Sequence, residues 1–498
     1  MLDIRLVGDP GQCDTLVLPV RGVAADPDPD TRAELLPPAA LPYPGDLAAE
    51  ASALVPLARL TGRAGEIRAH LRPAGSPSRL VLVGVGAGTE ADWRAAGAAL
   101  VRAVAEETRV TLALPADVPP AAVRGVAEGA LLGSYRFRMT GTGTDPALAE
   151  VTVAVTDPQR YAAAFDTARA TARMTRFARD LTNMPSSVKS PEWFAGQVDT
   201  ARAGLADLDL RVWQPDELTG AGFGGLLAVG GGSARGPRLV ELSWRPADAT
   251  RHVVLVGKGI TFDTGGISIK PVPAMKLMRK DMAGAAAVVA ATVGAAALRL
   301  PVRVTALAPL AENMVSGSAF RPGDVVRHYG GSTSETTNSD AEGRLVLADA
   351  LAYAVDRLAP DLLVDLATLT GANAVALGSR TAALYSDNDE LAAALVDAAA
   401  EAGESAWRMP LVGDYVEYLG SDLADYFSAP ARGAGSVVAA LFLREFTGDL
   451  RDRWAHLDMS APSWASAADR ELTAGATGWG VRTLLRWLPT LAQAATPS

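Results

Sequence analysis

Two short segments concentrate the side chains that can carry chemistry. The first begins at Lys258, which lies between two glycines after an apolar stretch, and reaches Asp263 beside a Gly-Gly pair. A lysine placed where backbone approaches closely must be desolvated, neutralised or matched by a carboxylate. The alternative is an ordinary Lys–Asp pair that braces a turn, and the spacing alone does not separate the two interpretations.

The second segment carries two acids at the start of an expected helix. Asp340 and Glu342 stand where a helix dipole favours carboxylates, and capping alone accounts for only one of them. Arg344 follows with a planar cation that binds anions. Oxygen-rich groups of this kind suit divalent cations. Four carboxylates and two lysines are therefore expected to converge: Asp263, Asp281, Asp340, Glu342, Lys258 and Lys270.

Other catalytic motifs fail. The chain has no GxSxG elbow and no HExxH, and its four histidines are scattered, so neither a serine hydrolase nor a histidine-based zinc site is expected. The glycine-rich stretch from Gly84 resembles a dinucleotide loop but has Thr89 where the last glycine would stand. A strand-to-helix turn is predicted there.

The elements that must position these residues follow from hydrophobic pattern. Short β-branched runs alternate with Ala-rich helical stretches, which is typical of βαβ units. Strands are predicted at residues 80–83, 110–114, 151–155, 252–256, 302–307 and 362–366, and helices at 91–107, 160–181, 283–298 and 341–358. The fold class is therefore α/β with two domains, each a mostly parallel or mixed sheet flanked by helices.

The length of 498 residues exceeds what one hydrophobic core usually covers. A Gly/Thr-rich break at residues 140–146 and a helical connector after it place the boundary. The predicted domains are residues 1–165, an N-terminal α/β domain for assembly or regulation, and residues 166–498, a C-terminal catalytic domain.

Bulk composition narrows the class of protein. Hydrophobic residues make up 49% and charged residues 20%, as in a globular enzyme. The net charge of −10 disfavours a nucleic-acid partner. The N-terminal segment has no basic-then-apolar leader, and the most apolar stretch, 283–298, is shorter than the ~20 residues that span a bilayer. A cytoplasmic protein without a membrane partner is expected.

These motifs resemble the cytosol (leucyl) aminopeptidases, a family of dinuclear metallopeptidases. The octapeptide from Asn338 to Leu345 matches the family's Asn-Thr-Asp-Ala-Glu-Gly-Arg-Leu, with Ser339 replacing threonine and keeping the hydroxyl. Further similarity covers the chain from about Leu181 to the C-terminus, including these segments: 257–271, 281–282, 367–371, 456–458 and 476–480.

The resemblance implies roles for particular residues. One metal ion would be held by Lys258, Asp263, Asp281 and Glu342, and the other by Asp263, Asp340 and Glu342 with the Asp340 carbonyl. Lys270 would be the catalytic cation, and Arg344 would hold a bicarbonate that acts as general base. Met278, Thr368 and Gly371 would line the first side-chain pocket, and the Leu369 carbonyl would receive the substrate amine.

The function implied is release of N-terminal residues, leucine-like ones preferred, from peptides by a water activated by two divalent ions, manganese or zinc. A homohexamer is expected by the same resemblance. The Arg279–Lys280 pair beside Asp281 leaves metal preference and pocket selectivity open. The alternatives are a DNA-binding hexamer of the same family with incidental catalysis, and a scaffold without catalysis, which retention of every expected ligand disfavours.

Overall fold

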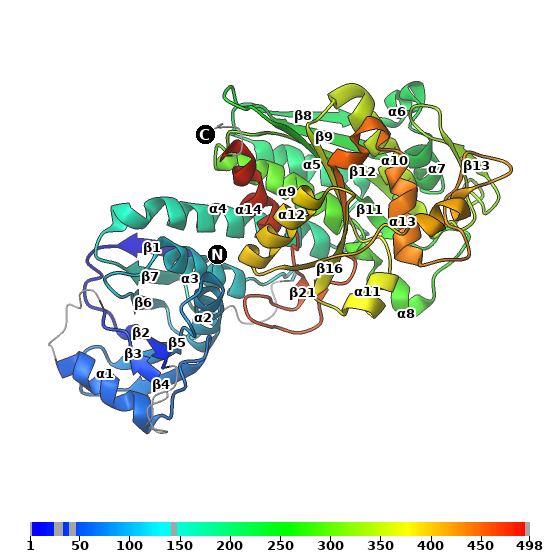
Figure 1. Ribbon diagram of the computed structural model, residues 1–498. Coiled ribbons are helices and arrows are strands. Elements are labelled where there is room, and N and C mark those ends of the chain that lie inside the picture. The colour runs from blue at the N-terminus through cyan, green and yellow to red at the C-terminus, as the bar shows by residue number, and fades with distance from the viewer. Residues whose placement is uncertain (1, 24–32, 39–45, 141–146, 494–498) are drawn as a thin grey trace. The chain divides into compact units, whose positions relative to one another are not determined.

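The chain forms two compact units in the computed structural model, which describes residues 2–23, 33–38, 46–140 and 147–493 (Figure 1). Unit 1 comprises Met1–Arg173 and Ser466–Ala474, and unit 2 comprises Met174–Ala465 and Gly475–Ser498. Each is a sheet flanked by helices, so the predicted two-domain α/β class is confirmed. The Gly/Thr-rich break, apart from Thr140, lies outside the described residues.

Unit 1 is built on a mostly parallel sheet in the order β1-β7-β6-β2-β5-β4, with β3 paired to β2. Among the described strands of this sheet, only β4 and β3 run antiparallel to their neighbours β5 and β2. The strands are β1 Asp3–Val7, β2 Thr15–Gly22, β3 Ala33–Leu35, β4 Ile67–Leu71, β5 Arg79–Gly84, β6 Arg109–Ala113 and β7 Glu150–Ala154. Its helices are α1 Asp46–Leu57, α2 Glu90–Ala103, α3 Pro120–Gly133 and the first part of α4 Pro158–Asn183.

The glycine-rich stretch after β5 is the predicted strand-to-helix turn. Thr89 is the N-cap of α2: its side chain accepts from the Asp92 amide, and the Asp92 side chain accepts from the Thr89 amide. This reciprocal capping box explains a threonine where a dinucleotide loop would need glycine.

Unit 2 is built on a nine-stranded mixed sheet, in which β17-β16-β19-β15-β10-β12-β9-β8 follow one another and β11 pairs with β12. The central strands β12, β10, β15 and β19 are parallel. The strands are β8 Leu208–Trp213, β9 Arg238–Trp244, β10 His252–Gly257, β11 Gly259–Asp263, β12 Arg303–Asn313, β15 Leu362–Ala367, β16 Thr381–Tyr385, β17 Ser405–Arg408 and β19 Trp454–Asp458. Smaller sheets contain β13 Val325–Arg327, β14 Thr333–Glu335, β18 Tyr426–Phe427, β20 Trp464–Ala465 and β21 Gly475–Ala476.

Helices of unit 2 cover both faces of this sheet. The α-helices are the last part of α4, and α5 Pro191–Arg202, α6 Pro215–Ala221, α7 Gly224–Gly230, α8 Val272–Met275, α9 Ala283–Ala297, α10 Glu342–Tyr353, α11 Ala372–Leu377, α12 Asp389–Ala402, α13 Gly435–Arg444 and α14 Val481–Gln493. Shorter helical turns are η1 Met278–Lys280, η2 Ala354–Leu358, η3 Gly413–Leu419 and η4 Gly448–Arg453. The predicted helix at 341–358 is α10, which ends in the π-helical turn η2.

Alternate residues of β10 enter two separate cores. Val253 and Leu255 pack into a core with α9, whereas Val254 and Val256 pack into a core with α10. A strand that is buried on both faces needs a continuous run of apolar residues, and the sequence from Val253 to Val256 is such a run. The carboxyl ends of β10 and β15 and the starts of α9 and α10 therefore meet around one edge of the sheet.

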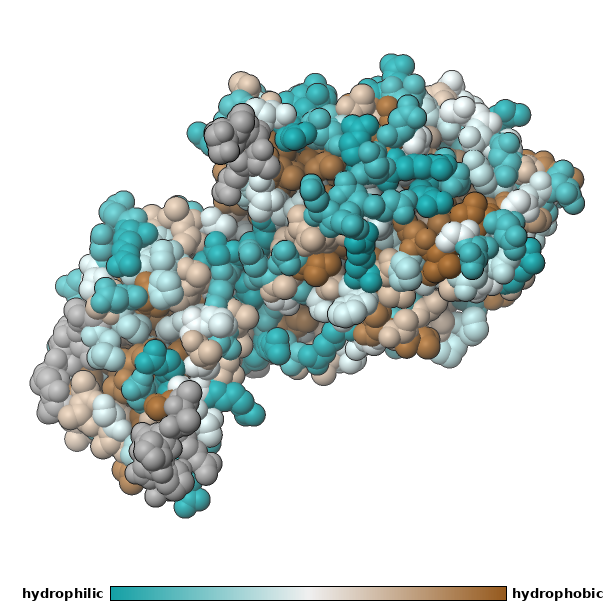
Figure 2. All heavy atoms as spheres, viewed as in Figure 1, coloured by the Kyte–Doolittle hydropathy of each residue, from teal (hydrophilic) through white to brown (hydrophobic). Residues whose placement is uncertain are grey.

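The apolar helix α9 is a core element, as predicted. The stretch Val272–Ala297 is long and apolar enough to cross a membrane by length and composition, but 89% of its most apolar window is buried inside the protein. On the face drawn in Figure 2, hydrophilic residues cover much of unit 2, and hydrophobic residues appear between them in small patches.

Candidate metal centre and active site

Lys258 lies between the end of β10 and the start of β11. Glycines in the neighbouring segments leave space for its side chain. A Cβ at Gly343 would lie 2.4 Å from Cε of Lys258, so the first turn of α10 needs glycine there. A Cβ at Gly257 would lie 2.5 Å from the Gly284 carbonyl oxygen in α9. The small residues on both sides of Lys258 thus bring two helix starts against one buried lysine.

The loop after Asp263 turns sharply through two glycines, as predicted. Gly265 and Gly266 have φ values of +87° and +63°, which side-chain-bearing residues rarely adopt. The Ser339 hydroxyl donates to the Gly265 carbonyl at 2.7 Å and accepts from the Ser268 amide at 2.7 Å. This hydroxyl, which replaces the family's threonine, joins the two motif segments.

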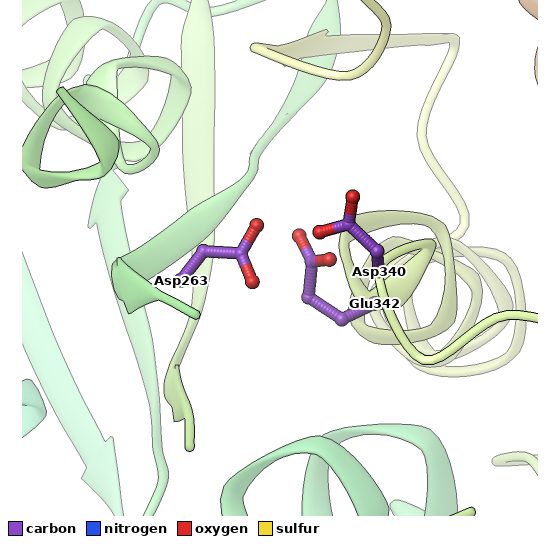
Figure 3. A group of neighbouring side chains, drawn as sticks. All are labelled: Asp263, Asp340 and Glu342. Atoms are coloured by element: carbon purple, nitrogen blue, oxygen red, sulfur yellow. The ribbon is translucent and has the colours of Figure 1, made fainter. Parts of the chain in front are cut away.

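Three carboxylates from these segments face one another. Asp263 approaches from the end of β11, and Asp340 and Glu342 approach from the start of α10 (Figure 3). One oxygen from each lies within 4.8 Å of the others. Asp281 is not part of this group of three and joins the cluster through Lys258.

Two lysines neutralise part of this negative charge. Lys258 Nζ lies 2.9 Å from Asp281 and 2.8 Å from Glu342. Lys270 Nζ lies 2.7 Å from Asp263 and also pairs with Asp340. The structure therefore brings together all four predicted carboxylates and both predicted lysines, far apart in sequence, in one connected network.

Burial sets the protonation behaviour of the cluster. Burial, and then the neighbouring Glu342, raise the pKa of Asp263 to about 6. Burial likewise raises the pKa values of Asp281 and Glu342. For Lys258, burial acts to lower the pKa, but Asp281 and Glu342 outweigh it and the pKa is raised. The cluster thus holds more buried negative charge than its lysines offset.

A divalent cation fits this donor set. Glu342 is 1% exposed, and its Oε2 has no hydrogen-bond partner among the described residues. A buried carboxylate oxygen without a partner is costly unless a cation or a hydrogen bond satisfies it. Carboxylate oxygens and a lysine amine at one buried point suit hard or borderline divalent ions.

Arg344 lies in the first turn of α10, two residues after Glu342. One of its terminal nitrogens donates to the Ser428 carbonyl at 2.7 Å, while its buried Nε has no hydrogen-bond partner among the described residues. Burial lowers its pKa to about 10, although Glu342 and Asp458 act in the opposite direction. A buried guanidinium with an unused donor can accept a small anion.

The residues expected to contact substrate lie after β15 and in η1. Thr368 donates its hydroxyl to Asp281 at 2.7 Å, and its carbonyl accepts from Lys258 Nζ at 3.1 Å. Leu369 follows, Gly371 is the N-cap of α11, and Met278 begins η1, three residues before Asp281. Thr368 is therefore hydrogen-bonded directly to two residues of the cluster, Asp281 and Lys258.

The last residue of β19 is one to which the sequence assigned no role. Asp458 is buried and accepts hydrogen bonds from the amides of Leu369 and Thr370 at 3.1 and 2.9 Å. It also accepts from the Thr370 hydroxyl and the Asn373 amide group, both at 2.7 Å. Its position at the carboxyl end of a central parallel strand was the available signal.

The two cations beside Asp281 have partners of their own. The Arg279 guanidinium lies 5.1 Å from the centre of the Trp464 ring, and Lys280 Nζ donates to the Ser460 carbonyl at 2.7 Å. Burial lowers the pKa of Lys280.

Comparison with known proteins identifies the family. The model of the cytosol aminopeptidase family catalytic domain matches residues 176–485, and the model of that family's N-terminal domain matches residues 31–140. A protein of Streptomyces avermitilis named "Probable cytosol aminopeptidase" is 44% identical, with 94% of each chain covered. One of the same name from Streptomyces coelicolor is 42% identical, with 97% of each covered.

Solved structures give the same result. The bottromycin maturation enzyme BotP is 39% identical, and the match covers 96% of this chain and 99% of that one with a TM-score of 0.83. The structure of BotP in complex with Mn matches with a TM-score of 0.84. The resemblance inferred from the motifs is thereby confirmed. The chain is a member of the cytosol aminopeptidase family, a family of metal-dependent peptidases.

Proposed function

We propose that the protein releases N-terminal residues from peptides, leucine-like residues preferred, through a water activated by two divalent ions. The observation that carries this proposal is the meeting of Asp263, Asp340 and Glu342, with ligand oxygens within 4.8 Å of one another and two lysines around them. The family membership supports the aminopeptidase class. The number of ions and the preference for leucine-like residues are what this proposal adds.

The residues that would hold the ions form two overlapping sets. The first is Lys258, Asp263, Asp281 and Glu342, and the second is Asp263, Asp340 and Glu342 with the Asp340 carbonyl. Two bound ions would supply a water of lowered pKa and would polarise the scissile carbonyl. Manganese is proposed because BotP has been solved in complex with Mn, and zinc is the alternative.

Around the cluster, side chains of this chain have separable tasks. Lys270 is partly exposed at the edge of the carboxylates, where its ammonium would stabilise the oxyanion that develops on the substrate. Asp281 would bind the free α-amino group, which restricts cleavage to the first peptide bond. Arg344, with its unused Nε donor, would hold a bicarbonate that takes the proton from the attacking water.

The first residue of the substrate would lie against Met278, Thr368 and Gly371, with its amine also bonded to the Leu369 carbonyl. A flexible thioether and a residue without a side chain suit an aliphatic group of leucine size. We further propose a cytoplasmic homohexamer, in which residues 1–165 serve assembly and residues 166–498 serve catalysis.

The test is hydrolysis of leucine p-nitroanilide by the full chain, before and after exhaustive chelation and after adding Mn²⁺ back. We expect chelation to abolish hydrolysis and Mn²⁺ to restore it. Metal content by mass spectrometry should reach two ions per chain. Activity that survives complete metal removal would contradict the proposal.

Substitution at Glu342 tests the proposed metal site directly, independently of the family membership. Glu342→Ala should lower kcat by at least about 1,000-fold and reduce bound metal, because this side chain belongs to both ligand sets. Exposed Glu390 in α12 provides the control, since Glu390→Ala should leave both quantities unchanged. Full metal content and turnover in Glu342→Ala would remove Glu342 from the site.

A further inference from the structure

A cavity of about 590 Å³ lies in unit 2 behind the strands that carry the metal-binding carboxylate. In the paired ends of β11 and β12, Phe262 stands opposite Glu312 and Asp263 opposite Asn313. Asn313 donates to Asp263 at 2.8 Å, so this pair faces the carboxylate cluster. Phe262 and Glu312 line the cavity. Because neighbouring side chains on a strand point to opposite faces, the cavity and the cluster lie back to back.

The lining of this cavity is cationic. Arg235, Lys276 and Arg279 contribute three positive charges, and Glu312 is the one carboxylate among the described residues that line the cavity. Both oxygens of Glu312 are engaged, one by the Ser233 hydroxyl at 2.6 Å and the other by Arg235 at 3.3 Å. The remaining positive charge belongs to Lys276 and Arg279.

Lys276 and Arg279 have capacity to bind a ligand. Within the described part of the chain neither forms an ion pair. The Arg279 guanidinium lies over the Trp464 ring, but its buried Nε has no hydrogen-bond partner there. Arg235 is held in place by the carbonyls of Ser186 and Ser187, at 2.8 and 3.0 Å, and so forms a fixed wall. The rest of the lining includes the apolar residues Phe262, Met314 and Val315.

We propose that this cavity binds a small organic anion, with a carboxylate or phosphate head on the Arg279 guanidinium, an apolar body against Phe262 and Met314, and the exposed Lys276 as a second positive charge. The volume is in the range of small-molecule sites, which combine apolar walls with a few directed polar groups. A guanidinium with an unused donor and a nearby ammonium recognise either head group. The site is separate from the peptide-hydrolysing cluster and does not depend on the function proposed for it.

The lysine distribution gives a selective probe of this site. The chain has five lysines, all in unit 2, and only Lys276 is exposed: Lys189, Lys258, Lys270, Lys276 and Lys280. The probe is 4-formylbenzoate, and 4-formylbenzamide is its neutral isostere. The aldehyde carbon condenses with Nζ and water leaves, after which cyanoborohydride delivers hydride to the imine and leaves a stable secondary amine. Peptide mass spectrometry then measures modification at Lys276.

We expect half-maximal modification of Lys276 at a concentration at least about five-fold lower for the benzoate than for the benzamide, since one well-placed ion pair is worth roughly this factor. Benzoate and phenyl phosphate are then added as competitors. The one that protects Lys276 better from modification identifies the preferred head group. Equal half-maximal concentrations for the two aldehydes, or no protection by either competitor, would overturn the proposal.

Substitutions at Arg279 test the geometry. Arg279→Gln should reduce the preference for the benzoate to less than two-fold, whereas Arg279→Lys should retain it. Arg202→Gln on α5, which removes the same charge outside the cavity, should also retain it. Circular dichroism verifies that each variant is folded. A preference unchanged in folded Arg279→Gln would exclude the assigned site.

Discussion

Lys258 and Lys270 stabilise four buried or half-buried carboxylates that would otherwise repel one another. Removing one partner of such a network leaves an uncompensated charge, which costs more than the pair itself contributes. Individual residues here are therefore hard to separate from folding, and the sharpest tests at residue scale are groups one step outside the network.

Asp458 is such a residue. Its two oxygens accept from the Leu369, Thr370 and Ser460 amides and from two side chains. Asp458→Asn turns one acceptor into a donor that faces other donors, so the loop from Thr368 should lose its fixed position. We expect KM for leucine p-nitroanilide to rise at least about 10-fold, with kcat changed less and metal content unchanged.

A control variant removes one of these hydrogen bonds without reversing any. Thr370→Val should raise KM by a smaller factor, because the Asp458 oxygen keeps its other donors. If Asp458→Asn instead lowers kcat with KM unchanged, the residue acts on the chemical step and not on substrate position.

At the scale of elements, a buried trio ties the β13–β14 hairpin to α10. Nδ1 of His328 lies 3.0 Å from Asp349, and its Nε2 lies 2.7 Å from the Ser334 hydroxyl. The order is that of a serine-hydrolase triad, but Ser334 and Asp349 are fully buried and His328 is 1% exposed. Asp349 also accepts the amides of Leu226 and Tyr329. The trio is therefore a structural clamp.

Ser334→Ala tests this interpretation. The substitution leaves Nε2 of His328 buried without a partner, so the free energy of unfolding should fall by about 1–3 kcal/mol in urea denaturation. The kcat/KM for leucine p-nitroanilide should stay unchanged, as it should in the exposed control Ser405→Ala. A large loss of activity at unchanged stability would instead identify Ser334 as a nucleophile.

The start of α9 packs directly on the sheet edge. A Cβ at Gly284 would lie 2.1 Å from the Leu366 carbonyl oxygen in β15, and backbone cannot give way by that much. Gly284→Ala should therefore move α9 away from β15 and lower the free energy of unfolding by about 3 kcal/mol or more. Activity should also fall, because Asp281 lies two residues before this helix.

The matched control is Gly196→Ala in α5, where nothing lies within 4 Å of the added Cβ. The same chemical change should there be neutral or should stabilise the chain by about 0.5–1 kcal/mol, since alanine favours helix. Urea denaturation of both variants compares them directly. Equal effects would show that helix propensity, and not close packing, governs Gly284.

At the scale of the whole molecule, acid should weaken unit 2 through His252, at the start of the central strand β10. Burial, and then Arg303, lower its pKa to about 4. The neutral ring is thus favoured in the folded state, while the unfolded chain takes up a proton near its ordinary pKa of about 6.5. The stabilisation is present above that pH and is lost as pH falls toward 4.

From these two pKa values we expect the free energy of unfolding to fall by about 2 kcal/mol between pH 7 and pH 5. Eight of the nine tryptophans lie in unit 2, so their fluorescence during urea denaturation reports on this unit. In His252→Gln this position does not titrate. Its free energy of unfolding should therefore fall by about 2 kcal/mol less than that of the unchanged protein between pH 7 and pH 5. Parallel pH profiles for the two proteins would contradict the assignment.

Local pattern was sufficient to predict the main buried elements and to select the carboxylates and lysines that meet in the structure. The apolar run of β10 and the Ala-rich run of α9 identify buried elements, because burial on both faces requires apolar side chains at every position. The Gly265–Gly266 turn was predictable because only glycine adopts its φ values without strain. The motif resemblance supplied the roles, which spacing alone left open beside a plain Lys–Asp pair.

Tertiary structure alone decided what depends on register and on groups distant in sequence. The sequence placed the strand after residue 302 only as far as 307, but β12 continues to Asn313 because β9 and β11 both pair with it. That extension puts Asn313 against Asp263 and turns Glu312 into the cavity behind. Likewise, Asp458 reaches the Leu369 loop only because β15 and β19 are parallel neighbours. A linear pattern specifies which faces are buried, whereas pairing between strands specifies which side chains meet.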